Sequence, residues 1–515
     1  MEPANSWAPM KSSSSVLRNI TSSWALLITV SICQVVQIPV ALKALGKEEF
    51  GLFAVVSQLL AMLMYVELGV TGAFSRLLID GIANGRDRYQ TVWASGFSLL
   101  LCQASVIFIA VLGMAPFIDN IFNIPPSLHS LACGLFIASG AITAGRYALD
   151  IFNITLYANQ RLSVSNLIGI AGTVIQLGVF VLAIRMGLGL WAYIWSLVTS
   201  SAFGVISAFL FCRLGGLLPK LNFSGVSWQQ IRSIFSLGMD VIFINLFNVF
   251  MSSAPLIFAG HFLTLQDVAV LAVNLKLVSL IYQIFHRIPG GAEPTLMTMI
   301  SHGEIGKFRF GWQVIAKVSL ASALFGGGCL YITSNLLIRW WTSPAMIMPA
   351  TATLFLCLMP LRHMIHYLFV SSLVMFKEIR KVRFSLVLEA LVYSALVIVL
   401  GKCFGLPGLL GGIILSLPLG AMWRGGYCFA KLSGCTLQSL MGMVFRVLFV
   451  PGFAFASLAV FATVEMRNSP FQVTLLMLAW CAINAVSLFT LAIHGNERTY
   501  LKELLSRVFP NAGKV

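Results

Sequence analysis

The sequence has little charge. Only 10% of its 515 residues are Asp, Glu, Lys or Arg, whereas soluble globular proteins carry roughly 25%. This shortage excludes a soluble enzyme, a nucleic-acid-binding domain and a disordered protein. The chain instead has 58% apolar residues and a mean hydropathy of +0.91. Both values predict an all-α polytopic membrane protein.

The sequence also lacks the motifs of metal and nucleotide chemistry. It has no CxxC pair, no HExxH, no Walker A sequence and no DxD pair, and its seven His are dispersed. Its ten Cys lie mostly in apolar stretches, which suits buried thiols better than a disulfide framework or a zinc site. We therefore expect no metal, no cofactor and no enzymatic activity.

Apolar runs bounded by charged residues, Gly and Pro predict about fourteen transmembrane helices. The expected spans are 24–44, 50–72, 91–117, 130–157, 163–184, 188–212, 233–260, 266–289, 311–338, 346–376, 384–402, 405–430, 442–464 and 470–493. Residues 1–23 are polar and carry no cleavable signal pattern, which predicts a cytoplasmic N-terminal tail. The apolar spacing within residues 495–515 predicts a cytoplasmic amphipathic tail.

The distribution of positive charge supports this count, because one wrong helix would invert every later loop. With a cytoplasmic N-terminus, 23 of the 33 Lys and Arg residues fall in cytoplasmic segments and 6 in external ones. The other 4 lie inside predicted spans. Both termini are therefore expected to be cytoplasmic.

The first half of the sequence recurs in the second half at a shift of 218 residues. Residues 45–55 align with 263–273, and Gly85 and Gly187 align with Gly303 and Gly405. Six spans separate the copies, so the repeat is parallel and resembles the two bundles of alternating-access transporters. The expected domains are the tail 1–23, six-helix bundles over 24–213 and 228–430, an extra helix pair over 442–494 and the tail 495–515.

Ionisable side chains inside a membrane span are costly and usually face a watery cavity or a partner. They occur here at Glu67, Arg146, Asp150, Asp240, Lys276, Lys317, Arg362, His363, His366 and Glu389.

The repeat places Arg146 opposite Arg362 or His363. Cations at matching places in two bundles would face each other and could hold a phosphate-bearing head group, for which the planar guanidinium is suited. Lys276 could add a third positive group. A plainer interpretation is that Arg146 forms a self-neutralising pair with Asp150, four residues later.

His363 and His366 lie one turn apart, but no carboxylate or thiol nearby in the sequence completes a metal ligand set. Cavity lining or polar packing is the expected role of both histidines, and a proton-coupling role stays open for them. The acids Glu67, Asp150, Asp240 and Glu389 are the other candidates for coupling protons or ions.

Several motifs resemble one transporter family. Residues 38–53 contain a proline in the first span followed by Leu45-Gly46-Lys47-Glu48-Glu49-Phe50-Gly51, and residues 67–76 begin with Glu67-Leu68-Gly69 and end with Arg76. Residues 156–161 form an exit motif that ends in Arg161. Together these motifs resemble the polysaccharide-transport branch of the multidrug/oligosaccharidyl-lipid/polysaccharide (MOP) exporter superfamily, the Wzx-type flippases of O-antigen and exopolysaccharide biosynthesis.

This resemblance implies a flippase for undecaprenyl-diphosphate-linked oligosaccharides in the bacterial inner membrane. It also implies a V-shaped, two-lobed fold with a cationic cavity, and transport by alternating access that is coupled to ions or protons. A polysaccharide polymerase and a chain-length regulator would be its candidate partners, and no nucleic acid is expected. Twelve helices are usual in this branch, whereas fourteen occur in its lipid II flippase relatives.

Three alternatives stay open at this point. A cation-coupled multidrug exporter of the same superfamily would favour an acidic, aromatic-lined cavity, whereas buried cations here at least match buried acids. A membrane-embedded glycosyl polymerase or acyltransferase would need a large external loop or an acid–base pair, and the predicted outer loops are short. Gene duplication can also produce a non-transporting membrane scaffold.

Overall fold

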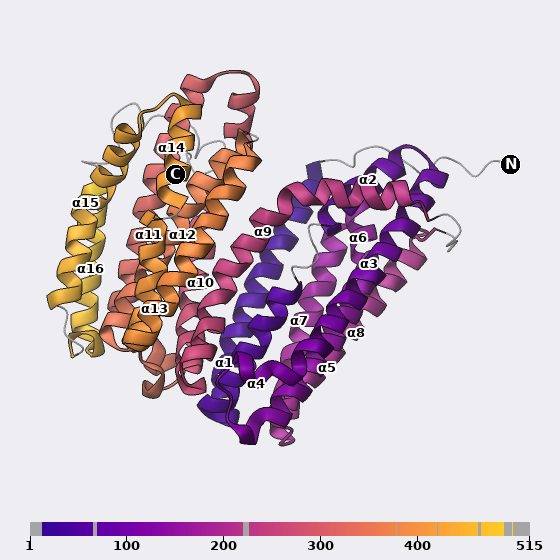
Figure 1. Cartoon of the computed structure of the whole chain (residues 1–515), viewed down its shortest axis with the longest axis horizontal. Helices are drawn as coiled ribbons and strands as arrows, with labels where there is room; N and C mark the ends of the chain where they lie inside the picture. The colour runs from indigo at the N-terminus through magenta and orange to yellow at the C-terminus, as the bar shows by residue number, and fades with distance from the viewer. Residues whose placement is uncertain are drawn as a thin grey trace. The chain divides into compact units, whose positions relative to one another are not determined.

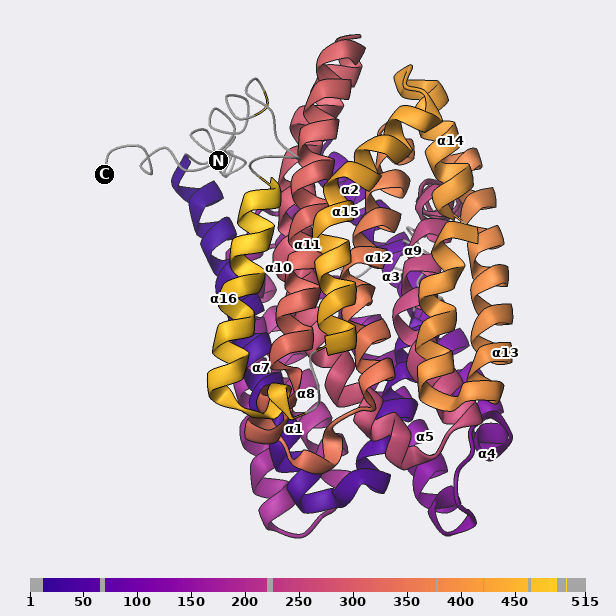
Figure 2. The same cartoon turned by 90° about the vertical axis from the view of Figure 1, so that its left-hand side faces the viewer.

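The computed structural model describes residues 13–64, 70–219, 226–376, 378–419, 421–461, 465–488 and 497. Within these ranges the regular structure is helical throughout, which confirms the predicted all-α class. The chain divides into two compact units, Met1–Val249 and Phe250–Val515, and each is described by itself (Figures 1 and 2). The longer helices are α1 (Ser13–Met64), α2 (Val70–Ala83), α3 (Arg86–Met114), α5 (His129–Leu149), α6 (Ile151–Ala158), α7 (Leu162–Arg185), α8 (Trp191–Leu214), α9 (Trp228–Phe262), α10 (Leu265–Ser301), α11 (Ile305–Trp341), α12 (Ala350–Met375), α13 (Ile379–Leu419), α14 (Ala421–Ser433), α15 (Leu437–Phe461) and α16 (Pro470–Ser487), and a single turn forms α4 (Ile118–Ile121).

The described residues contain 11 helices that are long and apolar enough to cross a membrane. Two of them, α1 and α13, each join two helical segments at a glycine of positive φ, Gly46 (76°) and Gly405 (61°). The last part of α9, Leu246–Phe262, is a further apolar segment. Counting both halves of α1 and α13 and including this segment gives fourteen apolar segments, as the sequence predicts.

Several helices extend beyond the predicted spans. The helix α1 begins at Ser13, inside the predicted N-terminal tail, and α10 continues to Ser301. The helix α11 has 37 residues, or about 55 Å at 1.5 Å per residue, which exceeds the ~30 Å of a hydrocarbon core. Hydropathy locates only the apolar part of such a helix, because the polar turns that extend past the membrane resemble loops in sequence.

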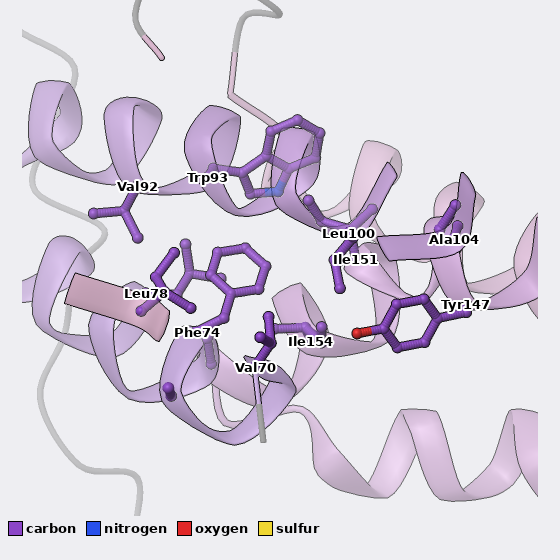
Figure 3. Packing of buried hydrophobic residues seen from close by; sticks show 14 of the residues in the cluster. Val70, Phe74, Leu78, Val92, Trp93, Leu100, Ala104, Tyr147, Ile151 and Ile154 are labelled. Atoms are coloured by element: carbon purple, nitrogen blue, oxygen red, sulfur yellow. The ribbon is translucent and has the colours of Figure 1, made fainter. Parts of the chain in front are cut away.

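The first unit contains α1–α8 and the beginning of α9. A cluster of buried hydrophobic residues lies among α2, α3, α5 and α6 (Figure 3). The ring of Phe74 from α2 covers Gly96 of α3 so closely that a β-carbon there would lie 2.1 Å from the ring. Trp93 of α3 is also buried in this cluster, and its indole N–H donates to Thr155 Oγ1 of α6 at 3.0 Å.

The internal repeat is visible in the backbone. Three glycine pairs separated by 218 residues all have positive φ, the left-handed region that glycine enters without steric cost. These pairs are Gly85 (108°) with Gly303 (74°), Gly187 (77°) with Gly405 (61°), and Gly216 (64°) with Gly434 (69°). Equivalent turns therefore end equivalent helices in the two halves.

A hydrogen bond repeats as well. Trp312 of α11 donates its indole N–H to Ser372 Oγ of α12 at 2.6 Å, just as Trp93 donates to Thr155 in the first unit. Because Thr155 and Ser372 differ by 217 residues, Arg146 of α5 aligns with His363 of α12 rather than with Arg362.

The second unit packs closely around a run of three glycines in α11. A β-carbon at Gly326 would lie 2.5 Å from the Phe285 ring of α10, and one at Gly327 would lie 2.2 Å from the Cys357 carbonyl oxygen of α12. At Gly328 it would lie 2.2 Å from the Trp480 ring of α16. The missing side chains let three helices approach α11 at one level.

The last two helices, α15 and α16, pack against α11 (Figures 1 and 2). Trp480 of α16 is fully buried and donates to the Phe325 carbonyl of α11 at 2.9 Å. In the turn between the two helices, Arg467 is 1% exposed and its guanidinium lies 4.4 Å from the centre of the Tyr331 ring of α11. The helix pair that follows the repeat is thus an integral part of the second unit.

The boundary between the two compact units differs from the boundary between the two predicted bundles. The division falls at Val249, inside α9, whereas the predicted bundles meet between residues 213 and 228. The first half of α9 packs with the first unit, since Ile234 joins the cluster around Phe74. The predicted domain boundaries therefore stay a prediction.

Candidate functional site: a buried charge cluster

Two helices of the second unit place charged side chains against each other. In α12, Arg362 and His366 lie four residues apart and so share one helical face. In α13, Glu389 and Tyr393 do the same. Pro360 precedes this face and lacks a backbone N–H, so α12 loses one internal hydrogen bond next to the charged residues.

Glu389 accepts hydrogen bonds at both of its oxygens. Arg362 Nη2 donates to Oε1 at 2.6 Å, and His366 Nδ1 lies 2.9 Å from Oε2. The Arg362 side chain is 2% exposed, that of Glu389 is 0% exposed and that of His366 is 8% exposed. We call these three residues the charge cluster.

Further contacts fix the guanidinium. Arg362 Nε donates to the Ile413 carbonyl in the last part of α13 at 3.2 Å, and Nη2 lies 3.2 Å from Met251 Sδ in α9. The guanidinium also lies 5.7 Å from the centre of the Tyr393 ring. Tyr393 is fully buried, and its hydroxyl makes no hydrogen bond within the described part of the chain. Arg362 thus joins α9, α12 and both segments of α13.

This pairing changes the role expected of Arg362. The sequence suggested a free cation that contacts substrate, but the positive charge is compensated by Glu389 inside one unit. In a low-dielectric interior such a pair has little net effect on stability when intact, whereas removing one partner costs about 3–5 kcal/mol. Glu389 and His366, expected as separate coupling candidates, belong to the same cluster.

The cations Arg146 and Lys276 are located differently. Arg146 is exposed on α5 and Lys276 is half-buried on α10, and neither forms an ion pair with any described residue. Arg146 lies near enough to Asp150 for an electrostatic attraction, but no close ion pair joins the two side chains among the described residues. Asp150 lies between α5 and α6 and accepts a hydrogen bond from Asn153 Nδ2 at 2.9 Å.

The remaining predicted residues lie in different surroundings. His363 is half-buried, with Nδ1 2.8 Å from the Met359 carbonyl of its own helix. Lys317 is paired with Glu497 at 2.7 Å, which connects α11 to the segment after α16. Glu67 and the side chain of Asp240 lie outside the described residues. No group of three or more metal-ligating side chains occurs in the part of the chain that is described.

Sequence reasoning missed the acid Glu293, because the predicted span ends at residue 289 whereas α10 continues to Ser301. Glu293 Oε1 accepts hydrogen bonds from Tyr367 Oη, at 2.5 Å, and from Ser371 Oγ, both on α12. If the predicted helix had been extended past residue 289, the helical spacing of acid and aromatic residues would have identified Glu293.

The fold is similar to the folds of several solved membrane proteins. The structure is similar to the lipid II flippase MurJ in an inward closed conformation, with a TM-score of 0.66 and 13% identity over 91% of this chain and 98% of that chain. It is also similar to an inward-facing multidrug-resistance MATE transporter of the MOP superfamily (TM-score 0.59, 13% identity, 79% and 95% covered). A Vibrio cholerae MATE transporter gives a TM-score of 0.58 at 14% identity, with 82% and 98% covered. The chain is a polytopic helical membrane protein whose fold is similar to the fold of these proteins.

The family comparison is more specific. Residues 43–289 match the family described as "Polysaccharide biosynthesis protein". No curated protein is similar enough in sequence to match the chain. The family match and the fold both support the predicted resemblance to the polysaccharide-transport branch of the MOP superfamily.

Proposed function

We propose that this chain is a flippase that moves undecaprenyl-diphosphate-linked oligosaccharide repeat units from the cytoplasmic to the periplasmic leaflet of the bacterial inner membrane, for surface polysaccharide biosynthesis. The observation that carries the proposal is a polysaccharide biosynthesis match in a chain with the fold of MOP transporters. Both termini are cytoplasmic in this proposal, as the bias of positive charge favours.

The substrate imposes two requirements on the protein. Its sugars and diphosphate must avoid the hydrocarbon, where unsolvated charges are strongly disfavoured, while its polyprenyl chain stays in lipid. Two helical units that expose a polar interior to each side in turn would meet both requirements. Alternating access is therefore the expected mechanism.

In this mechanism, Arg146 and Lys276 are the candidate cations for binding the diphosphate. Each is a cation on a predicted span without an ion pair to a described residue. Arginine can bind two phosphate oxygens through its planar fork, whereas lysine acts as a point charge. Paired Arg362 takes no part in this contact while Glu389 is ionised.

The charge cluster provides a candidate for proton coupling. Protonation of Glu389 would remove the negative partner of Arg362 and so leave a buried cation that must find another anion. A proton entering the cluster would thus make Arg362 available to the substrate. His366, bound to the same carboxylate, is the neighbouring proton carrier.

The function is tested in a strain that lacks its own polysaccharide flippase and expresses this chain. Restored surface polysaccharide is expected for the unmodified chain, loss for Arg146→Ala, and partial retention for Arg146→Lys, which keeps the charge without the fork. Arg185→Ala is the matched control, since Arg185 is an exposed arginine in the last turn of α7.

Two results would contradict the proposal. Surface polysaccharide at the unmodified level in the Arg146→Ala strain, with normal protein abundance, would remove the assigned diphosphate contact. Export of a cationic dye without any restored polysaccharide would favour the multidrug exporter instead.

A further inference from the structure

Polar side chains of α10 and α12 face each other along a strip separate from the charge cluster. In each helix they are spaced four or seven residues apart and so share one face. All are partly exposed, unlike the buried charge cluster. The members of this α10–α12 strip are Tyr282, His286 and Glu293 of α10, and His363, Tyr367 and Ser371 of α12.

Four of these side chains form a continuous row of rings. The ring centres of His363 and Tyr282 are 5.3 Å apart, those of Tyr282 and His286 are 5.1 Å apart, and those of His286 and Tyr367 are 4.1 Å apart. Contacts of this kind hold aromatic groups in fixed relative positions. Gly290 lies beside the row, since a β-carbon there would be 3.7 Å from Tyr367 Oη.

A fixed carboxylate ends the row. Tyr367 and Ser371 donate to the same oxygen of Glu293, Oε1. The other oxygen, Oε2, accepts no hydrogen bond from any described residue. The carboxylate is thus held in place with one oxygen still available.

The strip has more unused hydrogen-bonding atoms at its other end. Within the described ranges, neither Tyr282 Oη nor the ring nitrogens of His286 form a hydrogen bond, and His363 binds only through Nδ1. Polar groups inside a membrane span are costly unless they meet water or a ligand. A face that combines fixed rings with several unused donors and acceptors has the composition of a binding site for a polar organic molecule.

The charge of the strip selects the chemical class of that molecule. No member of the strip is Lys or Arg, although the neighbouring Arg287 acts electrostatically on the His286 ring. At the other end of the strip, the fixed Glu293 carboxylate would repel a phosphate group. A neutral sugar instead offers hydroxyl groups to the carboxylate and the imidazoles, and apolar C–H faces to the rings.

We propose that the α10–α12 strip binds the sugar portion of the lipid-linked substrate. This assignment rests on the proposed flippase function and adds a recognition surface to it. A site that hydrogen-bonds the hydroxyl groups of its ligand discriminates strongly against ligands that lack them. The strip therefore selects lipids that bear the oligosaccharide over undecaprenyl diphosphate alone.

The test measures transbilayer movement in proteoliposomes that contain the purified full chain. Three lipids are compared: undecaprenyl diphosphate, the same lipid with one sugar, and the same lipid with a complete repeat unit. The strip variants are Tyr282→Phe, His286→Ala and Glu293→Gln. Gln at 293 keeps an oxygen that Tyr367 and Ser371 can bind, so the local structure is retained.

Each strip variant is expected to lower the rate ratio of the complete lipid to the bare lipid about tenfold, as loss of one hydrogen bond of ordinary strength predicts. Movement of the bare lipid should not change, and this rate also reports that the variant is folded. The matched controls are Tyr427→Phe and His302→Ala, which alter exposed residues of α14 and the end of α10.

The outcomes separate the two proposals. If the unmodified protein moves none of the three lipids, the flippase function is overturned. If it moves them and the strip variants slow all three lipids equally, or none, only the sugar assignment is overturned. Uptake of tetraphenylphosphonium that is lost in Glu293→Gln would show that the strip binds organic cations instead.

Discussion

The charge cluster predicts that two damaging substitutions should restore stability when they are combined. Arg362→Met leaves Glu389 buried and unpaired, and Glu389→Leu leaves Arg362 in the same position. Because the two side chains are 2% and 0% exposed, water cannot compensate either charge, and each single variant should lose about 3–5 kcal/mol. The double variant removes both charges and should be within ~1–2 kcal/mol of the unmodified protein.

The coupling energy follows from a double-mutant cycle on thermal unfolding of the purified protein. His366 loses its acceptor in Glu389→Leu and in the double variant alike, so this cost cancels from the cycle. The matched control is the pair Arg88 and Asp80, which has the same 2.6 Å N–O distance but side chains that are 49% and 46% exposed. Asp80→Asn should change stability by less than about 1 kcal/mol.

Transport by the double variant separates a structural from a functional role. We expect it to fold and to fail to move the lipid-linked substrate, because neither a proton site nor a releasable cation remains. Transport at the unmodified rate would refute the functional reasoning and leave the cluster as packing only. A Glu389→Leu variant as stable as the unmodified protein would refute the electrostatic reasoning itself.

Four further predictions follow from individual contacts. Gly327→Ala should destabilise the protein by about 1–3 kcal/mol or more in thermal unfolding, since the new β-carbon would lie 2.2 Å from the Cys357 carbonyl oxygen. The control is Gly204→Ala in α8, where a new β-carbon would have nothing within 4 Å, and this variant should be neutral or stabilising in the same assay. Arg467→Ala removes a buried cation from the Tyr331 ring, and limited proteolysis should then cut the turn between α15 and α16 faster; an unchanged rate would show that this contact does not hold the helix pair. The hydrogen bond from Lys307 lowers the pKa of Glu304 in the folded protein. The stability that this contact contributes should therefore be present above the unfolded-state pKa of Glu304 and be lost as the pH falls through the lowered folded-state pKa. NMR titration of Glu304 in the Lys307→Gln variant should show a higher pKa. Glu389→Gln should make lipid movement independent of pH, and a retained pH profile would place the proton site elsewhere.

The fold was largely predictable from the sequence because two signals agreed. Apolar runs gave fourteen segments, and glycines at a constant shift marked equivalent turns, of which Gly85 and Gly303 both have positive φ. Glycine is required wherever the backbone enters that region, so its position records a turn directly. Helix ends were less predictable, since the turns of α10 and α11 beyond the apolar core resemble loops.

The charged residues of the site could be recognised from the sequence, but the contacts between them could not. Arg362, His366 and Glu389 were recognisable as charges that a membrane span would not carry without a reason. That Arg362 binds Glu389 depends on how α12 and α13 are rotated and shifted against each other, and the sequence of either helix alone does not set this. The same limit applies to the strip, where Glu293 of α10 meets Tyr367 of α12.

The flippase account is tested most directly by the transbilayer rate of an undecaprenyl-diphosphate-linked oligosaccharide in proteoliposomes with the purified chain. The account predicts movement well above that of protein-free vesicles, strongly reduced by Arg146→Ala and unaffected by Arg185→Ala. Movement no faster than in protein-free vesicles, from protein that unfolds cooperatively and is correctly inserted, would contradict it.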